Sequence, residues 1–306
     1  MILKSVSHRS MYNNFDYSHT NIIINYLKKF FNIKLIEHDC QTTINSDITI
    51  HGVWRKDITE NFELPENTFN ILWCYENVSM KDLYKYDIVF GDIRLDIPNL
   101  IYIPLYYYYS FDCANSITKR TDTQINKIIE NKTDFCCFLI SNDYGYDLFS
   151  GSCFEGCRKR IDFFKYLNNI KKVNSGGKCL NNIDSIVPKD KTLEFISKHK
   201  FMICFENSSK DGYFTEKMFQ CYEAGTIPIY WGHHNNYNDV NKLSFIQYTN
   251  NLDTANKVLE IDKDDTLYYN MLKEPIIKET KYTKDYILEE KKEKFKYLID
   301  KLFKNN

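Results

Sequence analysis

The chain has 306 residues, of which 43% are hydrophobic and 26% are charged, and its 40 basic and 41 acidic side chains leave a formal net charge of −1. This balance argues against a dedicated nucleic-acid-binding protein, because such domains are usually strongly basic. The 24 Tyr, 21 Phe and 3 Trp exclude an intrinsically disordered chain. At about 150 residues per domain, the length predicts two domains.

The ends of the chain carry no membrane or secretion signal that we recognise. No run reaches the roughly 20 consecutive apolar residues that a membrane-spanning helix needs, and the first twenty residues lack the apolar core of a secretory signal. Of three N-glycosylation sequons, at Asn77, Asn131 and Asn207, two fall in the site inferred below, where a glycan would block a ligand. We therefore expect a soluble, cytoplasmic protein without a membrane span.

Short apolar runs alternate with helix-like segments in the first half of the chain. An amphipathic pattern predicts a helix over residues 22–31. Apolar, β-rich runs predict strands at 32–38, 46–54, 69–76 and 86–92, followed by a last strand and a loop within 99–109. Runs of this length, separated by helical or loop segments, are typical of a mostly parallel sheet.

The second half repeats the same rhythm after a polar segment. Residues 115–134 are expected to form a surface helix and a linker, so we place the boundary between two α/β domains, 1–133 and 134–306, at its end. Strands are then predicted at 135–142, near 173–175, at 201–205 and at 226–231, with a helix that begins near Arg158. The last stretch, 284–306, predicts a mixed-charge surface helix in preference to a membrane-surface helix.

Residues 201–232 carry the densest signal. An apolar strand leads into a polar loop with Gly212 as its flexible point. Thr215 is expected to be the N-cap of a helix over 216–224 that Gly225 ends, and another apolar strand follows. Such a strand–loop–helix–strand unit delivers a helix N-terminus to the carboxyl edge of the sheet, where α/β proteins bind ligands.

The residues at the start of this helix suggest a phosphate-bearing ligand. Free N–H groups and the helix dipole attract phosphate, and Lys217 in the first turn would add a full positive charge beside a diphosphate. Glu216 could accept hydrogen bonds from sugar hydroxyl groups. Alternatively, Glu216 interacts only with the helix dipole. The residues alone do not favour either interpretation.

The segment FENSSKDGYFTEKMFQCYEAGTIPIYWG resembles the signature of the α1,3-fucosyltransferase family. Members are inverting enzymes that use GDP-fucose and have the GT-B fold. The resemblance implies two Rossmann-like domains that face a central cleft, with residues 1–133 binding the acceptor and 134–306 binding the GDP-sugar donor. It also implies transfer of L-fucose to a hydroxyl group of an oligosaccharide or glycoconjugate acceptor, in α1,3 linkage to GlcNAc or Glc.

The resemblance extends over roughly residues 46–275 and assigns further residues. FCCFLISN, and the helix that follows it, resemble the start of the family's donor domain, where Arg160 occupies the position of an arginine that contacts the diphosphate. NILWCYENVS is similar to the acceptor domain and offers Glu76 as the catalytic base. The proline that usually follows this acid is absent here. Alternatively, Glu76 is a solvated residue at the end of a strand.

These assignments imply a mechanism. Glu76 would take the proton from the acceptor hydroxyl as it attacks the anomeric carbon, and Glu216 would contact the fucose. Arg160 and Lys217 would stabilise the departing GDP, so no cofactor and no essential divalent metal are expected. The other predicted donor-binding residues are Asn207, Tyr213, Ser141 and Asn142.

Two short motifs suggest metal binding but have simpler interpretations. Asp262 and Asp264 form a D-x-D pattern between two helix-like stretches, where they predict a helix N-cap cluster. Cys153 and Cys157 form a C-x3-C pattern with no second ligand pair at zinc spacing. The cysteines within FCCFLI and FMICF are expected to be buried free thiols.

Two alternatives to a fucosyltransferase are considered. The chain could be a catalytically silent nucleotide-sugar or glycan-binding protein, or a related transferase with a different donor sugar. The presence of Glu76, Arg160, Glu216 and Lys217 favours an enzyme over the silent protein.

Overall fold

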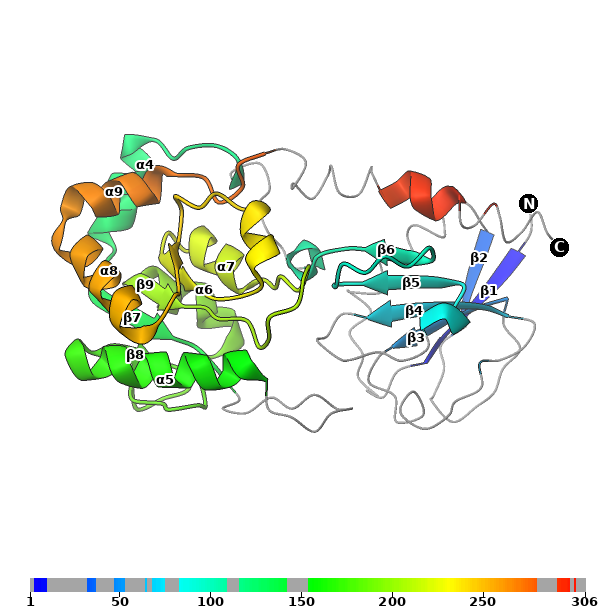
Figure 1. Cartoon of the computed structure of the whole chain (residues 1–306), viewed down its shortest axis with the longest axis horizontal. Coiled ribbons are helices and arrows are strands. Elements are labelled where there is room, and N and C mark those ends of the chain that lie inside the picture. The colour runs from blue at the N-terminus through cyan, green and yellow to red at the C-terminus, as the bar shows by residue number, and fades with distance from the viewer. Residues whose placement is uncertain are drawn as a thin grey trace. The chain divides into compact units, whose positions relative to one another are not determined.

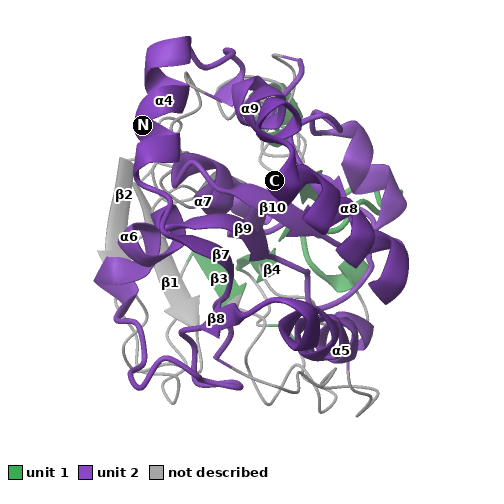
Figure 2. Cartoon of the chain, turned by 90° about the vertical axis from the view of Figure 1, so that its left-hand side faces the viewer, with its two compact units in different colours: residues 1–103, 291–306 green, residues 104–290 purple. Residues whose placement is uncertain are grey.

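The structure is a computed structural model that forms two compact units, residues 1–103 with 291–306 and residues 104–290 (Figure 2). Each unit is built on its own parallel β-sheet (Figure 1). The structure describes residues 3–9, 32–36, 47–52, 64, 68–74, 83–108, 116–141, 154–279, 291–297 and 300.

Unit 1 contains a six-stranded sheet in the order β2-β1-β3-β4-β5-β6, and all five strand pairs are parallel. The strands are β1 (Leu3–Arg9), β2 (Asn32–Ile36), β3 (Ile48–Gly52), β4 (Phe69–Cys74), β5 (Ile88–Gly91) and β6 (Leu100–Tyr102), with 3₁₀ helices at Leu83–Lys85 and Leu105–Tyr108. The strands expected from β2 to β6 are confirmed, β1 was not predicted, and the helix expected at 22–31 lies outside the described residues. Every side chain of β4 is buried, including the polar Asn70, as the otherwise apolar run indicates for a central parallel strand.

Unit 2 contains a five-stranded parallel sheet in the order β11-β10-β9-β7-β8. Its strands are β7 (Asp134–Phe138), β8 (Val173–Ser175), β9 (His199–Ile203), β10 (Ile227–Tyr230) and β11 (Ile246–Gln247). Its helices are α4 (Asp122–Glu130), α5 (Glu155–Ile170), α6 (Thr192–Ser197), α7 (Lys217–Glu223), α8 (Asn251–Lys263) and α9 (Asp265–Lys273), with 3₁₀ helices at Lys189–Lys191 and His234–Asn238.

Helices cover both faces of the unit 2 sheet, and alternate side chains of each strand contact opposite helix layers (Figure 2). In β7, Cys136 joins the core under α5, α8 and α9, whereas Cys137 joins the core under α6 and α7. Phe201 and Met202 of β9 alternate in the same way. Cys136, Cys137 and Cys204 are buried free thiols, as predicted.

The units divide between residues 103 and 104, whereas the predicted domain boundary lies at 133/134. The segment before α4 belongs to unit 2 because its side chains pack there. Tyr106 stacks on Phe219 with ring centroids 4.2 Å apart. Arg120 donates hydrogen bonds to the carbonyl oxygens of Tyr222 and Leu272, at the ends of α7 and α9. The sequence pattern shows the polarity of this segment but not these contacts.

The C-terminal residues group with unit 1, although the sequence analysis placed them in the second domain. Residues 291–297 are helical, and the buried Phe295 lies with its ring centroid 5.6 Å from that of Phe90 at the end of β5. Among the described residues, no helix combines the length and the apolar character needed to cross a membrane.

Candidate functional site

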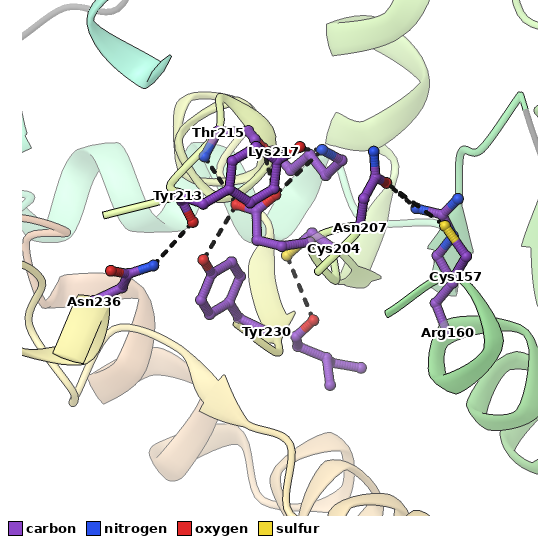
Figure 3. A network of polar contacts seen from close by, with 11 residues as sticks. Cys157, Arg160, Cys204, Asn207, Tyr213, Thr215, Lys217, Tyr230 and Asn236 are labelled. Carbon is purple, nitrogen blue, oxygen red and sulfur yellow. Dashed lines mark hydrogen bonds and ion pairs between the residues drawn. The ribbon is translucent and has the colours of Figure 1, made fainter. Parts of the chain in front are cut away.

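The candidate site lies at the carboxyl edge of the unit 2 sheet, where parallel strands bring together residues distant in sequence (Figure 3). Strand β9 ends at Ile203, and the chain continues through Glu206 and Asn207 into the loop before α7. Helix α7 begins with Lys217, and α5, which follows β7, carries Arg160. Sequence positions 160, 207 and 217 thus meet at one edge.

Glu206 is the fully buried carboxylate at this edge, with 0% of its surface exposed. Its Oε1 accepts hydrogen bonds from the backbone N–H of Thr215 at 2.9 Å and from the Tyr230 hydroxyl at 3.1 Å. Its Oε2 accepts from the Thr215 hydroxyl at 2.7 Å and from Nζ of Lys217 at 3.3 Å. Four donors therefore satisfy a charge that would be costly to bury unpaired.

Lys217 is held by hydrogen bonds to Glu206 and Thr215. Its Nζ donates to Glu206 Oε2 and, at 2.9 Å, to the hydroxyl oxygen of Thr215, while 17% of the side chain remains exposed. Burial alone would lower the pKa of Lys217, but the carboxylates of Glu206 and Glu216 outweigh burial and the nearby Arg160, so this pKa is raised above that of an ordinary lysine. Lys217 is therefore an ammonium ion throughout the physiological pH range.

Arg160 is the second cation at the site and is only 3% exposed. Its Nη1 donates to Oδ1 of Asn207 at 2.7 Å (Figure 3). Helix α5 reaches this position because Gly156 lies directly against the backbone beyond β9. The Gly156 N–H donates to the Asn207 carbonyl oxygen at 3.0 Å, and a Cβ at Gly156 would lie 1.9 Å from the carbonyl oxygen of Glu206.

The loop between Asn207 and Lys217 is anchored by Asn236. The Asn236 side chain donates to the Tyr213 carbonyl oxygen at 2.9 Å (Figure 3). It also accepts from the Gly212 N–H at 2.8 Å. Gly212 has φ +89°, a conformation that favours glycine. The side chain of Tyr213 is itself buried.

The predicted N-cap role of Thr215 is wrong. Helix α7 begins at Lys217, its N-cap position is Glu216, and no side chain caps it. The Thr215 hydroxyl donates instead to the buried Glu206, and its oxygen accepts from Nζ of Lys217 rather than from a backbone N–H of the helix. Gly225 ends the helix as predicted, with φ +66°.

The other predicted site residues are placed as follows. Glu216 lies half-buried at the start of α7, and its carboxylate has no hydrogen-bond partner among the described residues. Ser141 is exposed three residues beyond β7. Asn142 and Glu76 lie outside the described residues. Of the D-x-D pattern, Asp264 is the N-cap of α9, as predicted, and accepts from the N–H groups of Thr266 and Leu267, whereas Asp262 lies within α8 and pairs with Lys171 and Lys200.

Sequence reasoning missed Glu206. The available signal was its position, an acidic residue directly after the apolar run FMICF. A carboxylate placed there is buried by the sheet and must find partners.

Chemically, the site offers two fixed and permanently charged cations, Arg160 and Lys217, an arrangement suited to an anion such as a diphosphate.

The chain resembles known glycosyltransferases in both sequence and fold. Residues 129–295, more than half of the chain, match the family model described as the C-terminal part of glycosyltransferase family 10 (fucosyltransferase). The fucosyltransferase-like protein R654 of Acanthamoeba polyphaga mimivirus is 27% identical over 290 residues, which cover 90% of this chain and 43% of that protein. The α-(1,3)-fucosyltransferase FucT of Helicobacter pylori is 31% identical over 198 residues, 59% of this chain and 41% of FucT. The chain thus spans about two fifths of the length of these relatives.

The fold is also similar to that of a solved protein. The crystal structure of an α1,3-fucosyltransferase with GDP-fucose matches with a TM-score of 0.69 at 21% sequence identity, covering 97% of this chain and 90% of that one. This likeness confirms the predicted GT-B fold.

Gly156→Ala tests whether the contact between α5 and the Glu206–Asn207 backbone holds the site together. Alanine normally stabilises a helix by about 1 kcal/mol relative to glycine. Here we expect a destabilisation of about 2–3 kcal/mol, because the added methyl group overlaps a backbone oxygen. Urea unfolding measures the effect, with Lys165→Ala on the exposed face of α5 as the control. A Gly156→Ala protein as stable as the parent would contradict this packing.

Proposed function

The chain belongs to glycosyltransferase family 10, the fucosyltransferase family, and on that premise we propose that it transfers L-fucose from GDP-fucose to a hydroxyl group of a glycan acceptor. The transfer proceeds with inversion and forms an α1,3 linkage to GlcNAc or Glc. The observation that carries the proposal is the pair of cations, the buried Arg160 and the half-buried Lys217, fixed at one edge of the unit 2 sheet.

The donor side of the reaction follows from these two cations. When the bond to the sugar breaks, negative charge develops on the β-phosphate of GDP, and preorganised positive groups lower the barrier by stabilising it. The guanidinium of Arg160 binds phosphate oxygens through a planar fork of N–H groups, while Lys217 acts as a point charge. Asn207 supports Arg160 through its hydrogen bond of 2.7 Å.

The remaining donor contacts are proposed by position. Glu216 immediately precedes Lys217, and its carboxylate is half-buried without a hydrogen-bond partner among the described residues, so it can accept hydrogen bonds from fucose hydroxyl groups. Tyr213, Ser141 and Asn142 complete the proposed donor site. No cofactor is required, because Arg160 and Lys217 supply the charge that a divalent cation would otherwise provide.

The acceptor side depends on Glu76, which follows the carboxyl end of β4 by two residues. In an inverting transfer, a base removes the proton of the acceptor hydroxyl as that oxygen attacks the anomeric carbon from the face opposite GDP. A carboxylate suits this role, and Glu76 is the proposed base. The proposed acceptor is an oligosaccharide or glycoconjugate. The cytoplasmic location of the protein stays a prediction.

Arg160→Met and Lys217→Met test the donor site. We expect each to weaken GDP binding by about 10- to 100-fold, the usual effect of removing a hydrogen bond to a charged group. Calorimetric titration with GDP measures this, and the exposed Arg158→Met on the same helix is the matched control. Transfer by the parent protein should persist in EDTA. Equal affinities for Arg160→Met and Arg158→Met would contradict the diphosphate assignment, and abolition of transfer by EDTA would contradict the cation-only account.

Glu76→Gln tests the base. The variant should bind GDP-fucose as the parent does but transfer fucose at least about 100-fold more slowly, because only proton transfer is lost. GDP release in the presence of a panel of glycan acceptors measures transfer. Undiminished transfer would remove Glu76 as the base. A parent protein that binds GDP but transfers to no acceptor would favour a nucleotide-sugar-binding protein.

A further inference from the structure

A buried carboxylate lies among the groups proposed to bind an anion. Glu206 is fully buried, and its charge repels the diphosphate that Arg160 and Lys217 would hold. It contacts Lys217 directly, with Nζ and Oε2 separated by 3.3 Å. A negative charge at this place weakens phosphate binding unless its effect on the neighbouring groups outweighs the repulsion.

The hydrogen bonds around Glu206 fix the direction of each donor. The Thr215 hydroxyl has one hydrogen, which it gives to Glu206 Oε2 at 2.7 Å, so its oxygen can only accept from Lys217 at 2.9 Å. Lys217 Nζ thus donates two of its three N–H groups to Glu206 and Thr215, and no other described residue accepts the third. The Tyr230 hydroxyl and the Thr215 N–H bind the other oxygen, Oε1.

We propose that Glu206 is a positioning residue of the donor site, which orients Lys217 and the turn before α7 so that one N–H of Nζ faces the diphosphate of a bound nucleotide. This inference rests on the proposed function. Glu206 itself does not touch the donor. Its contacts connect the end of β9, the start of α7 and, through Tyr230, the end of β10.

Glu206 also determines the charge of Lys217. The charged groups that act on this ammonium are Glu206 beyond β9, Glu216 before α7 and Arg160 on α5. Burial and Arg160 disfavour the ammonium form, and the two carboxylates favour it. Without the charge of Glu206, Glu216 is the one described carboxylate left to oppose burial and Arg160, so the pKa of Lys217 falls.

Glu206→Gln tests this role, because it keeps the size of the side chain while removing its charge and turning one acceptor into a donor. We expect the dissociation constant for GDP to be about tenfold higher than in the parent at pH 7. The ratio of the two constants should increase as the pH is raised, because the pKa of Lys217 is lower in the variant. Comparing variant and parent at each pH cancels the titration of GDP itself. The control is Asp262→Asn, an equivalent change at a carboxylate paired with Lys171 and Lys200, which should leave the ratio at one.

A double substitution shows whether Glu206 acts through Lys217. In a Lys217→Met background, adding Glu206→Gln should not weaken GDP binding and should strengthen it, because the group that Glu206 positions is gone and only its repulsion of the diphosphate is removed. If Glu206→Gln instead weakens binding by the same factor in both backgrounds, or if its ratio to the parent is independent of pH, the carboxylate has a merely structural role and the proposal is overturned.

Two further measurements separate the role of Glu206 from the proposed function and from a failure to fold. Failure of the parent protein to bind GDP would contradict the proposed function, whereas a binding parent with an unaffected Glu206→Gln contradicts only the role of Glu206. If Glu206→Gln does not fold, as judged by thermal unfolding, Thr215→Val removes the bridging hydroxyl with little change of shape. This variant should weaken GDP binding about threefold, and unchanged binding would overturn the proposal.

Discussion

The ion pair between Glu206 and Lys217 is the interaction on which the candidate site depends. A carboxylate buried at the end of a central strand must be surrounded by donors, and this requirement fixes the chain from Asn207 to Lys217. The backbone and hydroxyl of Thr215 turn towards Glu206, Tyr230 reaches it from β10, and α7 starts one residue later than a Thr215 cap would place it.

Arg160 is held at the same edge of the sheet by a different set of contacts. Gly156 allows α5 to lie against the backbone of Glu206 and Asn207, and Asn207 then accepts the hydrogen bond from Arg160. Both cations are therefore held before any ligand arrives, which lowers the entropy that binding must overcome. Two placed cations are sufficient for one diphosphate, which is consistent with a chain whose formal net charge is only −1.

Much of this architecture could be predicted from the sequence. Strands buried on both faces appear as apolar runs, and Gly225 marks the end of α7 because φ +66° favours glycine. The role of Glu206 could not be predicted, since its partner Tyr230 is 24 residues away and meets it only in the folded sheet. The unit boundary also differs from the predicted one, because the packing of Tyr106 on Phe219 is a tertiary contact without a local pattern. Thr215 is not the predicted N-cap, because its hydroxyl group bonds to the buried Glu206 and to Lys217 instead.

A crystal structure of the full chain with bound GDP tests the central claim most directly. The account predicts diphosphate oxygens at hydrogen-bond distance, about 2.7–3.2 Å, from the guanidinium of Arg160 and from Nζ of Lys217, with Lys217 still bonded to Glu206. A nucleotide bound elsewhere, or bound here only after the Glu206–Lys217 pair has separated, would contradict it.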